Sequence, residues 1–200
     1  FNTAGAIRLG RRLEAFDPLW FEEPIPPDNL LEFQNVASQV RIPIATGERM
    51  TTKAEFSTVL RTGGASILQP ALGRSGGILE TKKIAAIGEV YNAQIAPHLY
   101  AGPVEWAANI QLAANIPNLL LVETILTGGD FHLKLIKNSI KWEDGFIIAP
   151  TEPGLGISFD EQVALDNPYN GKELHLQMSE EGCDYQNKND FLGGAPPRKN

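Results

Sequence analysis

The sequence has few features that would place the protein outside the cytoplasm. It contains a single cysteine, Cys183, among 200 residues, so the chain cannot form an internal disulfide. Its apolar runs fall far short of the roughly 20 residues that span a membrane. The opening residues FNTAGAIRLGRR lack the apolar core of a signal peptide. We therefore expect a soluble, cytoplasmic protein with no membrane partner.

Basic residues are also in the minority. The chain carries 17 Lys and Arg against 24 Asp and Glu, which gives a formal net charge of -7. A nucleic acid or an anionic membrane requires a basic protein surface, so this balance argues against both partners. The length suits one ordinary domain, or a part of a larger one. An acidic enzyme acting on a small molecule fits these numbers best.

The first 125 residues alternate short aliphatic runs with longer helical patterns, which is typical of repeated βα units and a parallel sheet. The predicted strands are residues 19–22, 42–46, 65–69, 93–97 and 118–123. The predicted helices are residues 3–15, 28–40, 52–62, 76–91 and 103–115. Strand starts recur about every 25 residues, close to the repeat of a (β/α)8 barrel.

Helix starts and the later residues carry recognisable signals. Asp28 is expected to cap the second predicted helix, Thr52 with Glu55 forms a capping box for the third, and Pro103 suits the first turn of the fifth. Beyond Glu123 we predict a hairpin centred on the EDG at 143–145. We divide the chain into a βα region at 1–145, a return segment at 146–176 and a disordered tail at 177–200.

Ionisable side chains recur at the carboxyl ends of the predicted strands, which share one face in a parallel barrel. Glu22 and Glu48 could supply oxygen ligands for a divalent cation such as Mg²⁺. His98 could take a proton near neutral pH. Glu123, if protonated, could donate a hydrogen bond to a developing oxyanion. Each residue alone could be a surface or turn residue, but their recurrence favours a site that removes a proton next to a carboxylate.

Six motifs together resemble a known family. WFEEP, IATGER, ILQPALGRSGGILE, IAPHLYAGPVE, LLVETI and PTEPGLGI are similar to the barrel domain of the enolase superfamily, in its mandelate racemase and sugar-acid (galactonate-type) dehydratase branch. The resemblance covers about residues 1–176. It implies an α/β fold, a TIM-like (β/α)7β barrel of which 1–145 would hold about strands 4 to 8. The capping domain of the family would be absent from this chain.

The resemblance also implies a role for each candidate residue. Members hold one Mg²⁺ through carboxylates that end the third, fourth and fifth strands, and the ion stabilises an enediolate after proton abstraction. The carried-over roles are Mg²⁺ ligands for Glu22 and Glu48, the base for His98, a hydrogen-bond donor for Glu123, orientation or neutralisation of the ligands for Glu23 and Arg49, and weaker substrate contacts for Arg74 and Tyr100.

Two departures from the family pattern affect this picture. The third metal ligand would lie just before Phe1, so we expect the chain to be the carboxyl-terminal part of a longer enzyme, with little or no turnover by itself. The sixth strand of the family commonly ends in Q-P-D, and its Asp hydrogen-bonds the seventh-strand His. Ala71 stands at that position here and cannot hold the imidazole of His98.

The leading hypothesis is a Mg²⁺-dependent sugar-acid dehydratase. It would remove the proton α to the substrate carboxylate and expel the β-hydroxyl as water, giving a 2-keto-3-deoxy acid. One alternative on the same scaffold is a racemase or epimerase of a 2-hydroxy acid. Another is a non-catalytic fragment or paralogue. The family resemblance further suggests a homo-oligomer for the complete enzyme.

Overall fold

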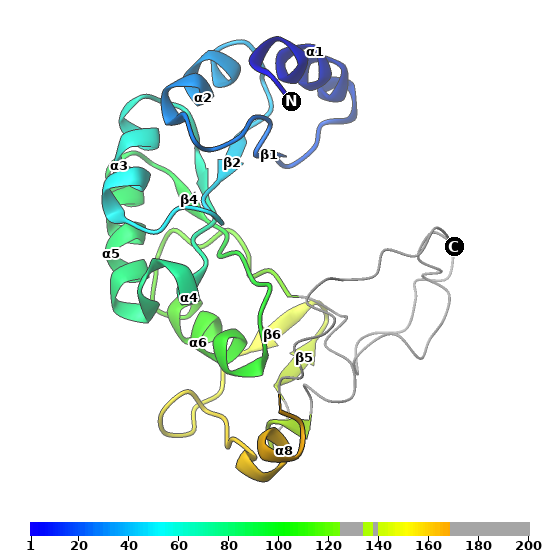
Figure 1. Ribbon diagram of the computed structural model, residues 1–200, viewed down its shortest axis with the longest axis vertical. Helices are drawn as coiled ribbons and strands as arrows, with labels where there is room; N and C mark the ends of the chain where they lie inside the picture. The colour runs from blue at the N-terminus through cyan, green and yellow to red at the C-terminus, as the bar shows by residue number, and fades with distance from the viewer. Residues whose placement is uncertain (125–133, 138–139, 169–200) are drawn as a thin grey trace. The chain divides into compact units, whose positions relative to one another are not determined.

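A computed structural model describes residues 1–124, 134–137 and 140–168 of the chain. They fall into two compact units, one of Phe1–Tyr100 with Ala108–Glu123, the other of Ala101–Ala107 with the described residues after Glu123. The elements, labelled in Figure 1, are α1 Thr3–Leu13, η1 Glu14–Phe16, β1 Phe21–Glu22, α2 Leu30–Ala37, β2 Ile44–Thr46, α3 Lys53–Arg61, β3 Ile67–Leu68, α4 Leu72–Ser75, α5 Gly77–Val90, β4 Gln94–Ile95, α6 Pro103–Ala113, β5 Lys141–Glu143, β6 Phe146–Ile148 and α8 Glu161–Asp166.

A parallel four-stranded sheet forms the centre of the first unit. Its strand order is β1-β2-β3-β4, and the chain passes through a helix between each strand and the next. Ile95 of β4 also makes a parallel bridge to Leu119, which adds a fifth segment to this side of the sheet. The predicted α/β class with a parallel sheet is confirmed. The barrel itself stays a prediction, because the described residues form only this open sheet.

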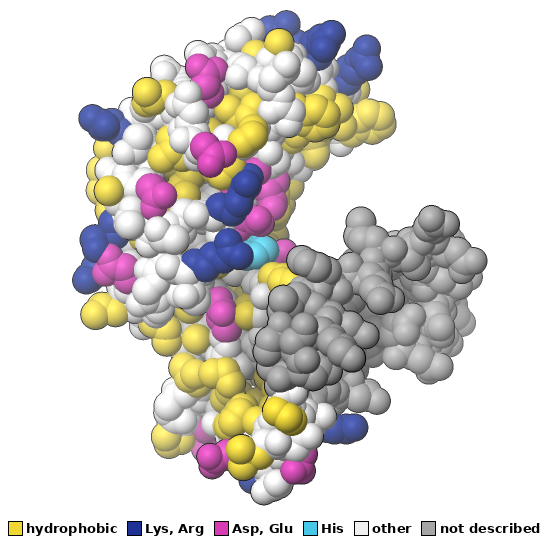
Figure 2. Space-filling model, viewed as in Figure 1, with side chains coloured by type: hydrophobic (Ala, Val, Ile, Leu, Met, Phe, Trp, Pro, Cys, Tyr) yellow, Lys and Arg dark blue, Asp and Glu magenta, His cyan; other side chains and the backbone are white. Residues whose placement is uncertain are grey.

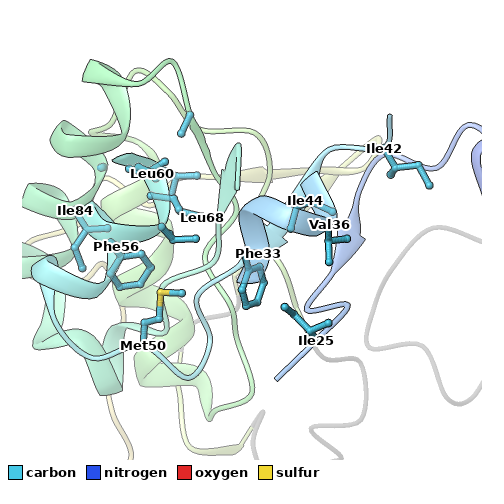
Figure 3. Packing of buried hydrophobic residues seen from close by; sticks show 14 of the residues in the cluster. Ile25, Phe33, Val36, Ile42, Ile44, Met50, Phe56, Leu60, Leu68 and Ile84 are labelled. Carbon is cyan, nitrogen blue, oxygen red and sulfur yellow. The ribbon is translucent and has the colours of Figure 1, made fainter. Parts of the chain in front are cut away.

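Alternate residues of β2 and β3 contribute to two separate apolar clusters. The larger cluster lies between the sheet and the helices. It includes Ile44 and Leu68 of the strands with Phe33 of α2 and Phe56 of α3 (Figure 3). Ile95 of β4 belongs to it as well. α2, α3 and α5 line this face of the sheet (Figure 1).

A smaller cluster lies on the other face of the sheet. It consists of Ala45, Ile67 and Ala96, with Trp20, Leu120 and Leu121 packed against it. Since successive strand residues point to opposite faces, the strand sequences direct every second side chain away from the helices. Residues that continue this alternation beyond the strand ends therefore point to the same face of the sheet as Trp20.

Local capping signals account for most of the helix starts. The capping box of α3 is confirmed: the Thr52 hydroxyl accepts a hydrogen bond from the Glu55 N–H, and the Glu55 carboxylate accepts from the Thr52 N–H at 2.8 Å. Pro103 begins α6, as predicted. The prediction that Asp28 caps α2 is wrong. Asn29 is the capping residue, and its Oδ1 accepts from the Leu31 N–H at 3.3 Å.

Prolines and glycines explain where the element bounds differ from the prediction. β2 begins at Ile44 rather than 42, because Pro43 has no N–H to donate to the sheet. The predicted helix at 76–91 begins at Gly77, and an unpredicted short helix, α4, ends just before it. Gly76 has a φ of 95°, a left-handed conformation that ends α4 and separates the two helices.

The last predicted strand, 118–123, is represented only by the bridge at Leu119 within the described residues. Ile95 donates its N–H to the Asn118 carbonyl at 2.9 Å, and Leu120 donates to the Ile95 carbonyl at 2.8 Å. β4 ends at Ile95. Pairing therefore stops after one residue pair, and residues 120–123 form neither helix nor strand.

In the second unit the predicted hairpin is confirmed, with β5 and β6 antiparallel. Its turn residues Asp144 and Gly145 have φ values of 49° and 84°, as a two-residue hairpin turn requires. The return segment contains α8, an unpredicted helix that Asp160 caps. The predicted disordered tail at 177–200 lies outside the described residues. Among the helices that the structure describes, none is both long and apolar enough to cross a bilayer.

Candidate functional site

The parallel strands place the candidate site residues at one end of the sheet. Glu22 is the last residue of β1, Glu48 follows β2 across Gly47, and His98 follows β4 across Ala96 and Pro97. Glu123 follows the segment that bridges to β4. Figure 2 shows acidic, basic and imidazole side chains gathered on one face of the molecule. Residues spread over a hundred positions of the sequence thus meet in space, as the strand-end pattern predicts.

His98 lies between two of the carboxylates. Its Nδ1 is 3.0 Å from Glu123 Oε2 and 3.5 Å from Glu48 Oε2. The pKa of His98 is raised, chiefly by the hydrogen bond to Glu123 and further by the negative charges of Glu123, Glu48 and Glu22; its partial burial opposes this. His98, Glu48 and Glu123 therefore form a connected group, and Glu22 is close enough to act on the imidazole electrostatically.

Glu123 accepts two hydrogen bonds through the same oxygen. Besides His98 Nδ1, the Leu99 N–H donates to Oε2 at 2.7 Å. Partial burial acts to raise the pKa of the Glu123 carboxyl, but these two hydrogen bonds lower it below its ordinary value. In this arrangement the lowered pKa favours a carboxylate that accepts a hydrogen bond from His98, and the hydrogen-bond-donor role expected for Glu123 stays a prediction.

Glu22 accepts hydrogen bonds from two uncharged donors. Trp20 Nε1 donates to Oε2 at 3.0 Å and Gln69 Nε2 donates to the same oxygen at 2.7 Å. Trp20 is two residues earlier along the chain and so lies on the same face, while Gln69 continues β3 past its end. Gln69 is 5% exposed, and its Oε1 is buried without a hydrogen-bond partner.

Glu23, the next residue, is held by a cation. Arg49 Nη2 and Nε donate to Glu23 Oε2 at 2.8 and 3.0 Å, and the Thr46 hydroxyl donates to Oε1 at 3.2 Å. The hydrogen bond to Glu23 raises the pKa of Arg49. Glu23 adopts a φ of 34°, which is unusual for a residue with a side chain. Both carboxylate oxygens of Glu23 are thus engaged, and a guanidinium offsets its charge.

Gly47 sets the path of the chain just before Glu48. It has a φ of 142°, and a Cβ there would lie 2.7 Å from Phe56 Cε1 and 2.9 Å from the backbone nitrogen of Gln69. A side chain at this position would have to displace a core ring and the backbone of Gln69, just past the end of β3. The glycine of the IATGER motif therefore fixes how Glu48 leaves β2.

The two expected substrate contacts differ in their surroundings. Arg74 lies in α4, and its Nη1 donates to the Glu48 carbonyl at 3.4 Å, so the guanidinium is next to the site. Tyr100 is 52% exposed and lies two residues after His98. Ala71, where the family pattern has Asp, is the N-cap residue of α4 and is buried. The carboxylate beside His98 comes instead from Glu123.

Within the part of the chain that the structure describes, no group of three or more His, Cys, Asp or Glu could hold a metal ion. The two proposed ligands still fit an oxygen-seeking cation in kind, since both are carboxylates at the same end of the sheet. The orphaned Gln69 Oε1 beside Glu22 shows that polar groups are buried here without complete pairing. Glu22 and Glu48 can therefore contribute to a cation site but do not complete one.

Three residues that contact the acidic pair have no role in the sequence-based prediction. Trp20 and Gln69 donate to Glu22, and Thr46 donates to Glu23. Gln69 ends a predicted strand, so its position was a usable signal. Trp20 and Thr46 read as ordinary apolar and β-branched strand residues, and only the structure shows their polar contacts.

Comparison with known proteins gives a consistent result. A sequence model of the family described as enolase C-terminal domain-like matches residues 1–163. A D-galactonate dehydratase of Ralstonia nicotianae is 37% identical over 164 residues, which are 79% of this chain and 43% of that protein. The chain thus spans less than half the length of this curated relative.

Solved structures of higher identity match as well. A mandelate racemase/muconate lactonizing enzyme from a Sulfitobacter species is 65% identical, with a TM-score of 0.83 over 92% of this chain and 46% of that one. A mandelate racemase/muconate lactonizing enzyme-like protein from Roseovarius sp. TM1035 is 63% identical, with the same TM-score and the same coverage. The sheet, the strand-end residues and these matches agree, and the chain belongs to the enolase C-terminal domain-like family.

Proposed function

We propose that the chain forms the proton-abstracting half of a Mg²⁺-dependent dehydratase acting on a sugar acid. The observation that carries the proposal is the placement of His98 Nδ1 3.0 Å from Glu123 and 3.5 Å from Glu48 at the strand ends. The curated relatives at 37 to 39% identity, named D-galactonate dehydratase, support the choice of reaction.

His98 would act as the base through its second ring nitrogen. With Nδ1 donating to the Glu123 carboxylate, the neutral imidazole keeps its proton on Nδ1 and leaves a lone pair on Nε2. Nε2 would take the proton from the carbon α to the substrate carboxylate, and Glu123 would stabilise the resulting imidazolium. Glu123 would in this way supply the carboxylate that Ala71 cannot.

Glu22 and Glu48 would hold the Mg²⁺, and the ion when bound would supply positive charge for the substrate carboxylate. Arg74, beside the Glu48 carbonyl, would add a second cation for an anionic substrate. The electron pair left by the α-proton forms the new carbon–carbon double bond as the β-hydroxyl departs. The proton that His98 takes balances the proton that this hydroxyl needs in order to leave as water. The enol product then tautomerises to a 2-keto-3-deoxy acid.

The test places residues 1–163 of this chain in the matching part of the Sulfitobacter protein, with which the chain is 65% identical. Aldonic and aldaric acids are incubated with Mg²⁺, and 2-keto acid is measured as its semicarbazone. We expect dehydration of at least one acid and its loss in His98→Asn. Glu89→Gln, an exposed change on α5, is the matched control and should keep full activity.

A second function is favoured by the names of the solved neighbours, which at 63 and 65% identity are more similar than the dehydratases. A racemase would use His98 on one face of the α-carbon and a second base on the other. Racemisation of a 2-hydroxy acid without release of 2-keto acid would assign this reaction in place of dehydration. Failure of both reactions, with the Sulfitobacter protein itself active, would favour a non-catalytic role.

A further inference from the structure

The dipeptide Glu22–Glu23 offers two adjacent carboxylates with opposite surroundings. The donors to Glu22 are the indole of Trp20 and the amide of Gln69, and both are uncharged. The donors to Glu23 include the guanidinium of Arg49 at 2.8 Å. A neutral donor fixes a carboxylate without offsetting its charge, whereas a cation competes with any metal for it. Only Glu22 therefore keeps its full charge for a cation.

We infer that Gln69 and Trp20 are positioning residues that form a neutral clamp on Glu22, an inference that rests on the proposed function. Both donate to the same oxygen, Oε2, so they hold the carboxylate by one side and leave Oε1 as the oxygen available to a cation. The pair comes from different strands: Trp20 precedes Glu22 on the β1 side, and Gln69 follows β3. The clamp thus ties the metal ligand to the sheet at two points.

The burial of Gln69 supports a role other than packing. Its side chain is 95% buried, yet Oε1 has no hydrogen-bond partner. An unpaired buried acceptor lowers stability, and an apolar side chain of equal length would avoid this loss. The amide therefore benefits Glu22 rather than the fold. Replacing it by Met should weaken cation binding without destabilising the protein, two effects that a merely structural residue would not show together.

The experiment uses the chain placed, as above, in the matching part of the Sulfitobacter protein, so that a third ligand can be present. Its probe is the terbium ion, which prefers oxygen ligands as Mg²⁺ does and emits when excited through a nearby indole. Trp20, whose Nε1 is 3.0 Å from Glu22 Oε2, provides the indole. Terbium emission is titrated, and Mg²⁺ is then added to displace the ion. We expect Gln69→Met to weaken terbium binding about 10- to 100-fold, the usual effect of removing a group that orients a metal ligand.

Urea unfolding of the metal-free chain is the second readout, and Gln69→Met should unfold at an equal or higher urea concentration. Gln94→Met is the matched control, since Gln94 is an exposed glutamine on the neighbouring strand β4; it should change neither readout. Trp20→Phe keeps the ring against the cluster of Ala45 and Ile67 but removes the N–H. Calorimetry with Mg²⁺ should show weaker binding for this variant.

The outcomes separate the clamp from the proposed function. If Glu22→Gln binds terbium and Mg²⁺ as the unchanged chain does, Glu22 is not a metal ligand, and the proposed function and the clamp both fail. If Glu22→Gln weakens binding but Gln69→Met does not, the clamp alone is refuted. Weaker binding in Gln69→Met together with an equal loss of stability in urea would also overturn the clamp, because it would show a structural role.

Discussion

Gly47 offers the sharpest test of how the fold positions the site, through the substitution Gly47→Ala. The new Cβ would lie 2.7 Å from Phe56 Cε1, 2.9 Å from Gln69 N and 3.0 Å from Gln69 C. Phe56 is fully buried, and Gln69 N donates to the Thr46 carbonyl at 2.9 Å. Neither neighbour can move without disturbing the core or the pairing of β2 with β3.

The expected magnitude has two parts. A side chain at a positive φ, here 142°, costs ~1–3 kcal/mol of strain. Forcing a methyl group into packed surroundings costs a further ~1–3 kcal/mol. Gly47→Ala should therefore lower the free energy of unfolding by ~2–6 kcal/mol, and it should also weaken cation binding, because Glu48 follows directly.

Gly63→Ala separates the cost of backbone strain from the cost of close packing. Gly63 also has a positive φ, 72°, but a Cβ there would meet nothing within 4 Å, so only the backbone penalty of ~1–2 kcal/mol applies. Urea unfolding followed by circular dichroism measures both variants. Equal losses in Gly47→Ala and Gly63→Ala would refute the argument that close contact with Phe56 and Gln69 fixes this turn.

Three further predictions concern capping and charge. Thr52→Ala removes the side-chain cap of α3 and should lower the free energy of unfolding by ~1 kcal/mol in the same urea assay; an unchanged midpoint would contradict the capping box seen here. Partial burial acts to raise the Glu55 pKa, but hydrogen bonds from Thr52 and the N–H groups of Thr51 and Thr52 lower it below its unfolded value. The unchanged chain should therefore be more stable than Glu55→Gln, with the full difference in free energy of unfolding above about pH 5. This difference should disappear as the pH falls through the folded pKa, and a difference that does not depend on pH would contradict the prediction. Arg49→Met leaves the Glu23 carboxylate, 11% exposed, without its cation. It should therefore destabilise the chain by ~1 kcal/mol more than the double variant Arg49→Met with Glu23→Gln does. A double variant less stable than Arg49→Met would exclude a stabilising pair.

The sequence was sufficient to predict the elements that depend on local signals. Thr52 with Glu55, Pro103 and the Asp144–Gly145 turn each act on the backbone within a few residues, and the structure has them as predicted. Periodicity also predicted the parallel sheet. Strand lengths were overestimated because the extent of pairing depends on the neighbouring strand, as at Leu119, where β4 has no further residues to offer.

The candidate site could be predicted to a similar extent. The convergence of Glu48, His98 and Glu123 follows from parallel topology alone, and the structure brings their side chains together. Hydrogen-bond partners were less predictable, because they depend on distances between strands. The link from Gln69 to Glu22 joins positions 47 residues apart, and the protonation of Glu123 depends on the Leu99 N–H as well as on His98.

The register of β1 decides which of two identical side chains carries a net charge. Phe21 pairs with Ile44 and Glu22 with Ala45, and this register turns Glu22 toward Trp20 and Glu23 toward Arg49. A slip of one residue would exchange the faces, since side chains alternate along a strand. Glu22 would then move to the helix side, and Glu23 would enter the site. The two residue pairs between β1 and β2 therefore determine which glutamate stays charged and which is neutralised. The two side chains are chemically identical, so they cannot determine this by themselves.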